Sequence, residues 1–347
     1  MRRPITLFTG QWADLPFEEV ARLAAGWGYD GLEIACWGDH LDVSRAAVDD
    51  AYVQSRRDVL DRHGLKVFAI SNHLTGQAVC DDPIDVRHRD MLTPAVWGDG
   101  DPEGVRHRAA DQLKDTARAA ARLGVDTVVG FTGSAAWKYV AMFPPVSQDL
   151  IDQAYEDFAD RWNPILDVFD QEGVRFAHEV HPSEIAYDYY TTERALEAIG
   201  HRPAFGLNWD PSHFIWQGLD PVMFLWDFRD RIYHVDCKDA RLRVGNGRRG
   251  VLGSHLPWAD PRRGWDFVST GHGDVPWEDC FRMLNTIGYA GPLSIEWEDA
   301  GMDRLVGAPE ARHFVADQVF DPPQQSFDAA FSTGRRSTPA PPATRES

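Results

Sequence analysis

The stretch Val174-Arg-Phe-Ala-His-Glu-Val-His-Pro182 decides the fold. Its apolar start, after the helix-ending Gly173, predicts a buried strand, and its terminal proline ends the pairing of that strand. The carboxyl end of the strand nevertheless carries Glu179 between two histidines, His178 and His181. A buried carboxylate costs several kcal/mol unless a cation or hydrogen bonds compensate it. We therefore expect Glu179 to face such a partner.

Three later strand-like runs also finish on an acidic residue: Phe205–Asp210, Ile232–Asp236 and Leu293–Glu296. Parallel strands in a barrel place their carboxyl ends at one mouth, so these acids should meet. A single acidic strand end is usually a helix cap or an ion-pair partner, but four at matching positions predict a shared metal site. The expected ligands are Glu179, Asp210, Asp236 and Glu296.

The same strand–helix unit occurs eight times along the chain. The other four predicted strands are Ile5–Thr9, Leu32–Cys36, Lys66–Ser71 and Asp126–Phe131. This alternation implies an α/β fold with an all-parallel sheet, and eight units in one domain fit a closed (β/α)8 TIM barrel best. A doubly wound sheet is the alternative, although no Gly-x-Gly-x-x-Gly follows the first strand. We expect one barrel domain over residues 1–321.

Long loops and a tail complete the predicted organisation. The segments 74–101, 132–145 and 240–270 are expected as long loops at the carboxyl face, the first of them an irregular lid or binding loop. Residues 322–347 are Pro-rich and low in apolar side chains. We expect them to form a C-terminal extension that is partly disordered.

Charge and cysteine content exclude several classes of protein. A formal net charge of −19 argues against nucleic acid, whose binding needs Lys and Arg to displace counterions, and against anionic membranes. No apolar run reaches the roughly 18 residues of a membrane span, and the start lacks the apolar stretch of a signal peptide. Four scattered cysteines without a Cys-x-x-Cys favour reduced thiols. We therefore expect a cytoplasmic protein.

Histidines and a lysine accompany the acids. Oxygen ligands alone suit Mg²⁺ or Mn²⁺, and a nearby histidine shifts the choice toward Mn²⁺, Co²⁺ or Zn²⁺. His234 lies two residues before Asp236 on the same side of the strand but deeper, where it is either a supporting partner or a core histidine. His213 is expected as a ligand, a substrate contact or a turn residue. His181 and Lys238 face the same mouth.

The remaining candidates would contact substrate. Arg263 would hold an anionic or hydroxylated group, Trp37 would stack on a sugar ring, and His73 ends the third strand. The segment 271–277, Gly-His-Gly-Asp-Val-Pro-Trp, would either bind phosphate at a helix start or form a plain turn and cap. Glu33 is expected instead to belong to a buried structural ion pair.

Taken together, these strand ends resemble the xylose isomerase-like barrel superfamily, which includes sugar phosphate isomerases and epimerases, inosose dehydratases and ketose 3-epimerases. The resemblance spans about residues 3–320. The motifs that carry it are Gly28-Tyr-Asp-Gly-Leu-Glu33, Glu179-Val-His-Pro182, Asp210-Pro-Ser-His213, His234-Val-Asp-Cys-Lys-Asp239, Gly271-His-Gly-Asp274 and Ser294-Ile-Glu296. The set is specific for the superfamily and weak for the reaction.

The resemblance also implies roles for these residues. Glu179, Asp210, the residue at 236 and Glu296 would bind one divalent metal, usually Mn²⁺. The two glutamates would double as acid and base, and His213 would contact a substrate oxygen. Relatives usually carry a histidine where this chain has Asp236, so the site here would be all-carboxylate, unless the strand shifts and His234 takes over.

The predicted chemistry is proton removal beside a sugar carbonyl. A metal would polarise the carbonyl and its adjacent hydroxyl and acidify the C–H between them. Glu179 or Glu296, with His181 as the other choice, would take that proton to give an enediolate. Return of the proton to the neighbouring carbon isomerises the sugar, and return to the opposite face epimerises it.

Other activities fit the same residues. If a leaving group lies β to the carbonyl, the site is a lyase, as the resemblance to dehydratases and to C-glycoside deglycosidase large subunits implies. Those subunits act on 3-oxo-glucosides beside a small β-sandwich partner. We therefore expect a keto-sugar or an oxidised glycoside as substrate, and a homo-oligomer or a hetero-oligomer with such a subunit. An apurinic-site endonuclease, which needs more histidines and a basic face, and a non-catalytic sugar-binding protein are the remaining alternatives.

Overall fold

The computed structural model describes residues 3–141, 143–243 and 248–323, together with residues 325 and 329. The expected C-terminal extension, residues 322–347, therefore falls almost entirely outside the described residues. Among the helices that the structure describes, none is both long enough and apolar enough to cross a membrane.

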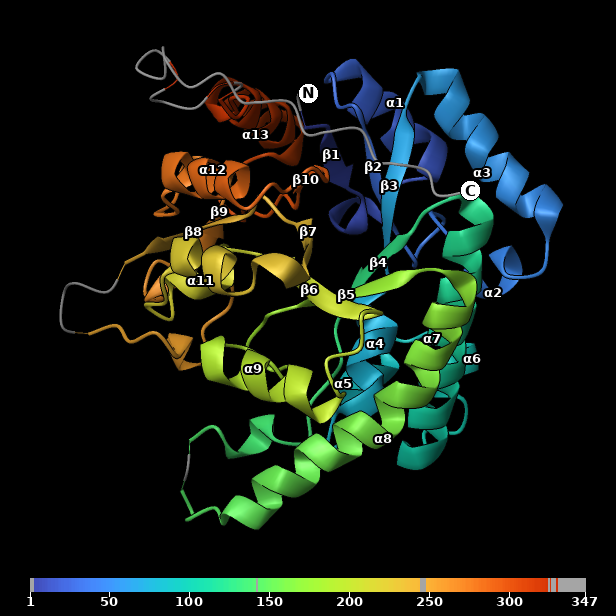
Figure 1. Cartoon of the computed structure of the whole chain (residues 1–347), viewed down its shortest axis with the longest axis vertical. Helices are drawn as coiled ribbons and strands as arrows, with labels where there is room; N and C mark the ends of the chain where they lie inside the picture. The colour runs from blue at the N-terminus through green and yellow to red at the C-terminus, as the bar shows by residue number, and fades with distance from the viewer. Residues whose placement is uncertain (1–2, 142, 244–247, 324, 326–328, 330–347) are drawn as a thin grey trace, which may run out of the picture.

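Eight parallel strands form the barrel (Figure 1). The pairing runs β10-β1-β2-β3-β4-β5-β6-β7, and a bridge between Asp236, just after β7, and Ser294 of β10 closes the ring. The prediction of a single (β/α)8 TIM barrel is thus confirmed. The strands are β1 (Ile5–Phe8), β2 (Gly31–Ala35), β3 (Lys66–Ser71), β4 (Thr127–Gly130), β5 (Arg175–Glu179), β6 (Phe205–Trp209), β7 (Ile232–Val235) and β10 (Leu293–Ile295).

The main helices lie outside the strands (Figure 1). Three of them end at a glycine with positive φ, namely Gly64, Gly124 and Gly173. Glycine adopts this left-handed conformation at little cost, so these residues end the helices where the sequence predicts. The main helices are α1 (Phe17–Gly26), α3 (Asp50–His63), α7 (Pro102–Leu123), α8 (Gln148–Glu172), α9 (Tyr189–Ala198), α11 (Pro221–Asp227), α12 (Trp277–Thr286) and α13 (Arg304–Gln318).

The packing between helices and strands sets the direction of the strand ends. Trp162 of α8 packs against Phe176 of β5 with ring centroids 4.6 Å apart and planes inclined by 44°, and the Phe176 centroid lies 5.8 Å from that of Phe205 of β6. Successive side chains of a strand point to opposite faces. Because Phe176 packs outward against α8, Ala177 and Glu179 point into the barrel.

The segment 74–101 is not the irregular loop that its composition suggests. It contains three short helices, α4 (His73–Cys80), α5 (Val86–Arg89) and α6 (Pro94–Trp97). Asp85 and Thr93 cap the second and third of these helices. A four-residue helix is too short to show a 3.6-residue apolar period, so the capping residues are the only sequence signal that indicates it.

The segment 240–270 also contains regular structure. It holds an antiparallel hairpin, β8 (Asp239–Leu242) and β9 (Trp265–Val268), which is inserted between β7 and β10 (Figure 1, yellow to orange). The remaining short elements are α2 (Val43–Ala46), α10 (Ser212–Ile215) and the 3₁₀ helices η1 (Gly10–Trp12), η2 (Trp137–Tyr139), η3 (Arg229–Arg231) and η4 (Gly253–His255).

Candidate active site

Acidic side chains from four strands gather at the carboxyl end of the barrel. Glu179 ends β5, Asp210 and Asp236 follow β6 and β7, and Glu296 follows β10. All four are between 0% and 7% exposed. One ligand atom from each of Glu179, Asp236 and Glu296 lies within 4.8 Å of the other two. Ligands on opposite sides of a cation are about 4–5 Å apart, so these three fit one coordination sphere.

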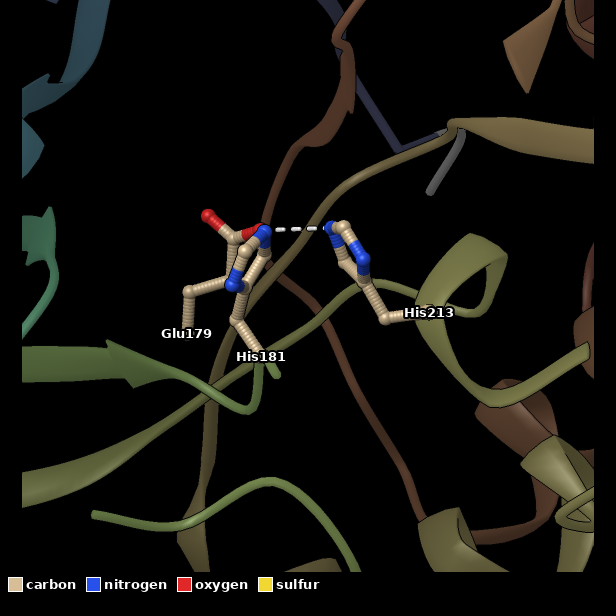
Figure 2. Close-up of side chains that lie close together, drawn as sticks. All are labelled: Glu179, His181 and His213. Carbon is tan, nitrogen blue, oxygen red and sulfur yellow. Dashed lines mark ion pairs between the residues drawn. The ribbon is translucent and has the colours of Figure 1, made fainter. Parts of the chain in front are cut away.

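His213 connects Asp210 to this group. Its Nε2 lies 3.2 Å from Glu179 Oε1 and 3.1 Å from Asp210 Oδ2. Figure 2 shows the Glu179 contact, with His181 close beside it, and the two imidazole centroids are 4.0 Å apart. Glu179, His181 and His213 also offer ligand atoms within 4.8 Å of one another. The arrangement thus suits His213 as a nitrogen ligand or as a substrate contact.

Several oxygens of this site lack a hydrogen-bond partner. Among the described residues, Asp210 Oδ2, Asp236 Oδ1 and Glu296 Oε2 are buried and accept no hydrogen bond, although His213 Nε2 lies 3.1 Å from the first oxygen and His234 Nε2 lies 3.6 Å from the second. A buried ionised oxygen in that condition is costly unless a cation compensates it. Because acceptors from three strands are left unsatisfied at one place, the residues fit a divalent metal. Carboxylate oxygens with imidazoles beside them suit Mn²⁺ well.

Burial makes two of the acids hard to ionise. It raises the pKa of Asp236 to about 7, and neighbouring acids add to the rise. Burial also raises the pKa of Glu296 well above its ordinary value, against the opposing charge of Lys238. A cation among these carboxylates would favour their charged forms and lower both pKa values.

Glu179 differs because histidines hold it. Its Oε2 pairs with His73 Nε2 at 2.8 Å, while Oε1 faces His213. Burial opposes the charge of Glu179, but the hydrogen bonds from His213 and His73 outweigh it and hold its pKa well below the usual range. For His181, burial and the nearby His213 lower the pKa well below its ordinary value, so its ring is neutral at neutral pH.

Deeper in the barrel, Glu33 and His234 form a closed ion pair. His234 Nε2 lies 2.7 Å from Glu33 Oε2, and the hydroxyls of Ser71 and Ser294 donate to the same carboxylate. Against the effect of burial, the charge of Glu33 raises the pKa of His234 to about 10. The prediction that Glu33 belongs to a buried ion pair is confirmed. His234 Nε2 lies 3.6 Å from Asp236 Oδ1, and Glu33, His234 and Asp236 also offer ligand atoms within 4.8 Å of one another.

A cavity of about 540 Å³ opens onto the acids. Glu179 and Glu296 line its inner part together with Lys238, whose Nζ lies 3.0 Å from Glu296 and 3.1 Å from Glu298. Aromatic side chains provide much of the remaining wall: Phe8, Trp37, Phe131, Trp258, Phe267 and Trp297. The cavity therefore combines a charged inner end with an apolar wall.

Three of the six predicted substrate contacts line this cavity, namely His73, Lys238 and Trp37, and so does the predicted base His181. His213 and His234 do not line it. Arg263 is instead buried in the insertion, where its Nη1 donates to Leu256 O at 2.8 Å and its Nε lies 3.3 Å from Asp266 Oδ1. The glycine-rich segment 271–277 is a turn, because the backbone N–H groups of Gly271, Gly273 and Val275 donate to Asp239. These donors are therefore not free for a phosphate.

Among the residues of the site that the sequence analysis did not predict are Asn208, Trp258 and Phe267. Asn208 donates from Nδ2 to Asp236 Oδ2 at 2.5 Å. It lies two residues before Asp210, so the alternation of the strand already placed both on one face. Trp258 and Phe267 line the cavity from the insertion, where no periodic pattern indicates which aromatic residues face inward.

Comparison with known proteins agrees with this fold. The profile of the xylose isomerase-like TIM barrel family matches residues 21–318, and the chain belongs to this family. The uncharacterized protein YfiH of Bacillus subtilis (strain 168) is 27% identical over 322 residues, which cover 87% of this chain and 95% of that protein. An inosose dehydratase of Clostridium perfringens (strain 13 / Type A) is 22% identical over 172 residues, 49% of this chain and 57% of that protein.

A solved structure shows the same fold. The 3-keto-D-glucoside 4-epimerase YcjR from E. coli superposes with a TM-score of 0.63 at 15% identity, covering 91% of this chain and 100% of that chain. The dehydratase is thus similar in sequence over part of its length, and the epimerase is similar in fold.

Proposed function

We propose that this protein is a divalent-metal-dependent sugar isomerase or epimerase that removes a proton from the carbon beside a sugar carbonyl and proceeds through an enediolate. The observation that carries the proposal is the group of unsatisfied buried oxygens on Asp210, Asp236 and Glu296, next to the hydrogen-bonded Glu179. Similarity in sequence to an inosose dehydratase and in fold to a sugar epimerase supports the same class of reaction.

The proposed metal site uses one acid from each of four strands. Glu179, Asp210, Asp236 and Glu296 would hold one divalent ion, for which Mn²⁺ is the best match and Mg²⁺, Co²⁺ and Zn²⁺ are the alternatives. When bound, the ion polarises the carbonyl and the neighbouring hydroxyl and so acidifies the C–H between them.

The chain's own residues supply the proton transfer. Glu179, which contacts His73 at 2.8 Å, and Glu296, which contacts Lys238 at 3.0 Å, would take the proton and return it. His181 faces the same cavity and is the other candidate base. The Lys238 ammonium would donate a hydrogen bond to a substrate oxygen that gains negative charge.

A lyase is the second candidate. With a leaving group β to the carbonyl, removal of the same proton expels that group and leaves an unsaturated ketone. The size of the cavity, about 540 Å³ with an aromatic wall, favours this version because it leaves room for a leaving group larger than water. An oxidised glycoside such as a 3-oxo-glucoside is then the proposed substrate.

Exchange of solvent hydrogen tests the proposal. Mn²⁺-loaded protein is incubated in D₂O with a panel of ketohexoses and 3-oxo-glucosides, and deuterium at the carbon beside the carbonyl is measured by NMR. We expect uptake that disappears after chelation and in Glu179→Gln. Glu19→Gln, in an exposed i,i+3 pair with Arg22, is the matched control and should behave like the parent protein. No deuterium uptake and no release of a leaving group from any member of the panel would reject the proposal.

A further inference from the structure

The outer wall of the cavity comes from the insertion between β7 and β10. Its two strands pair antiparallel, with Ala240 opposite Phe267. Trp216 stacks on Trp265 with centroids 4.6 Å apart and planes 4° from parallel, and Trp265 Nε1 donates to Val251 O at 2.8 Å. The insertion is therefore a packed unit that holds its aromatic side chains in fixed positions.

Trp258 lies at the rim of the cavity and is held from two sides. It is 54% exposed. Its ring stacks on Phe267 with centroids 5.1 Å apart and planes 30° from parallel, and the Arg263 guanidinium carbon lies 4.0 Å from the Trp258 ring centroid. Stacking and cation–π contacts of this kind fix an indole without burying it. The exposed part of this ordered side chain lines the cavity.

Phe267 joins this rim to the acids. Its ring centroid is 5.5 Å from that of His213, and Lys238 Nζ lies 4.4 Å from it. An aromatic surface thus runs from the inner site outward to Trp258. Pockets of about 300–1,000 Å³ hold drug-sized ligands, so the cavity of about 540 Å³ has room for a sugar and a second ring.

Asp266 is a polar residue of the cavity wall close to Trp258, and it is 4% exposed. Its Oδ1 accepts from Ala259 N at 3.2 Å and lies 3.3 Å from Arg263 Nε. Its Oδ2 makes no hydrogen bond within the described residues, but it is buried, with Arg243 Nη1 3.8 Å away. The hydroxyls of a second sugar would need accessible hydrogen-bond partners here, whereas a planar apolar ring needs only contact with the aromatic side chains. The chemistry of the rim therefore favours an aromatic substituent.

We infer that Trp258 and Phe267 form a second subsite, which binds a planar aromatic ring attached to the sugar. The substrate class is then an aryl-substituted glycoside rather than a free keto-sugar. Arg263 is a positioning residue that holds Trp258. The inference rests on the proposed function for the placement of the sugar end at the acids.

Binding of unreactive glucosides tests the subsite. Isothermal titration of the Mn²⁺-loaded protein compares phenyl β-D-glucopyranoside with methyl β-D-glucopyranoside, which differ in the ring alone. We expect the phenyl glucoside to bind about 5- to 10-fold more tightly, the size of one aromatic pair. Trp258→Ala should reduce this ratio to about 1–2, and Trp258→Phe should retain most of it. Trp226→Ala on α11, a similarly exposed Trp outside the cavity, is the matched control and should leave the ratio unchanged.

Several outcomes would overturn the subsite. These are equal binding of the two glucosides, an unchanged ratio in Trp258→Ala, or cellobiose binding as tightly as the phenyl glucoside. A change of molar mass in light scattering with an unchanged ratio would mark Trp258 as an interface residue instead. If Trp258→Ala does not fold, Trp258→Leu applies the same test, because it keeps apolar volume without a planar ring. Intact deuterium exchange with no phenyl preference rejects the subsite alone, and a phenyl preference without exchange rejects the proposed function alone.

Discussion

Two clusters of side chains in this barrel contain buried carboxylates, and the clusters differ in whether the carboxylate oxygens have hydrogen-bond partners. In the inner cluster, Glu33 accepts hydrogen bonds from His234, Ser71 and Ser294. In the outer cluster, which consists of Glu179, Asp210, Asp236 and Glu296, three acids each keep a buried oxygen with no hydrogen-bond partner among the described residues. Both clusters are removed from water, so burial alone does not distinguish them.

The difference separates a structural pair from a ligand site. A buried pair that is complete within the protein resists change, since loss of either partner leaves an uncompensated charge. A cluster whose buried oxygens lack hydrogen-bond partners within the protein is a candidate site for a ligand from outside the protein. Asp236 lies between the two, because its Oδ1 is 3.6 Å from His234 in the inner cluster. Substitutions on either side should therefore have different consequences, and the following experiments measure them.

The largest effect is expected from an outer-cluster ligand. Glu296→Gln removes one proposed metal ligand and one candidate acid or base, so kcat/KM should fall by about 10³-fold. Bound metal, measured by mass spectrometry after dialysis, should fall in parallel. The exposed Glu278, paired with Arg282 on α12, provides a matched Glu278→Gln control with full activity. Unchanged metal content and activity in Glu296→Gln would remove the distinction between the clusters.

The inner cluster should respond in stability. Glu33→Gln leaves the His234 imidazolium without its buried counter-charge, and we expect a loss of about 3–5 kcal/mol in the free energy of unfolding in urea. The double variant Glu33→Gln/His234→Gln should recover part of that loss, since no lone charge remains. A loss below about 1 kcal/mol in the single variant would contradict the view that this pair is closed and charged.

Metal binding should stabilise the fold through the outer cluster alone. At a hundredfold excess of Mn²⁺ over its Kd, the free energy of unfolding should rise by about 2.7 kcal/mol. Asp236→Asn should lose most of this rise, whereas Asp274→Asn, which affects an acid in the 271–277 turn, should keep it. Thermal melts with Mn²⁺ and with chelator provide the measurement. Equal stabilisation of both variants would place the metal elsewhere.

Much of this division was visible in the sequence. Apolar runs that end in Glu179, Asp210, Asp236 and Glu296 predicted the barrel and the gathering of acids, because parallel strands share an edge. Glu33 was also assigned to an ion pair. Which histidine completes that pair could not be derived, since the contact between Glu33 and His234 joins β2 to β7 across 201 positions of the chain.

In the insertion between β7 and β10, the sequence did not predict which side chains face the cavity. Arg263 was expected at the substrate, yet it supports Trp258 from within the packed hairpin. Both residues lie in the segment that connects β8 to β9, and position along the chain does not distinguish them. The fold of this segment places Trp258, but not Arg263, in the cavity wall. The insertion thus supplies side chains that would determine specificity, but its sequence has no periodic pattern from which their orientation could be predicted.

The smallest effect is expected for His40, a buried histidine outside both clusters. Its pKa is lowered, whereas that of His234 is raised. His40 lies against Thr9 Oγ1 at 2.9 Å and Leu15 O at 3.2 Å, and burial lowers its pKa below the ordinary value of 6.5. Since its folded pKa is the lower one, its contribution to stability is complete above about pH 6.5 and is lost as the pH falls below it. We expect a decrease of at most about 1.4 kcal/mol per pH unit between pH 6.5 and 5. His40→Gln should flatten this slope in urea titrations at each pH, and an identical slope in the variant would show that His40 is already charged in the folded protein.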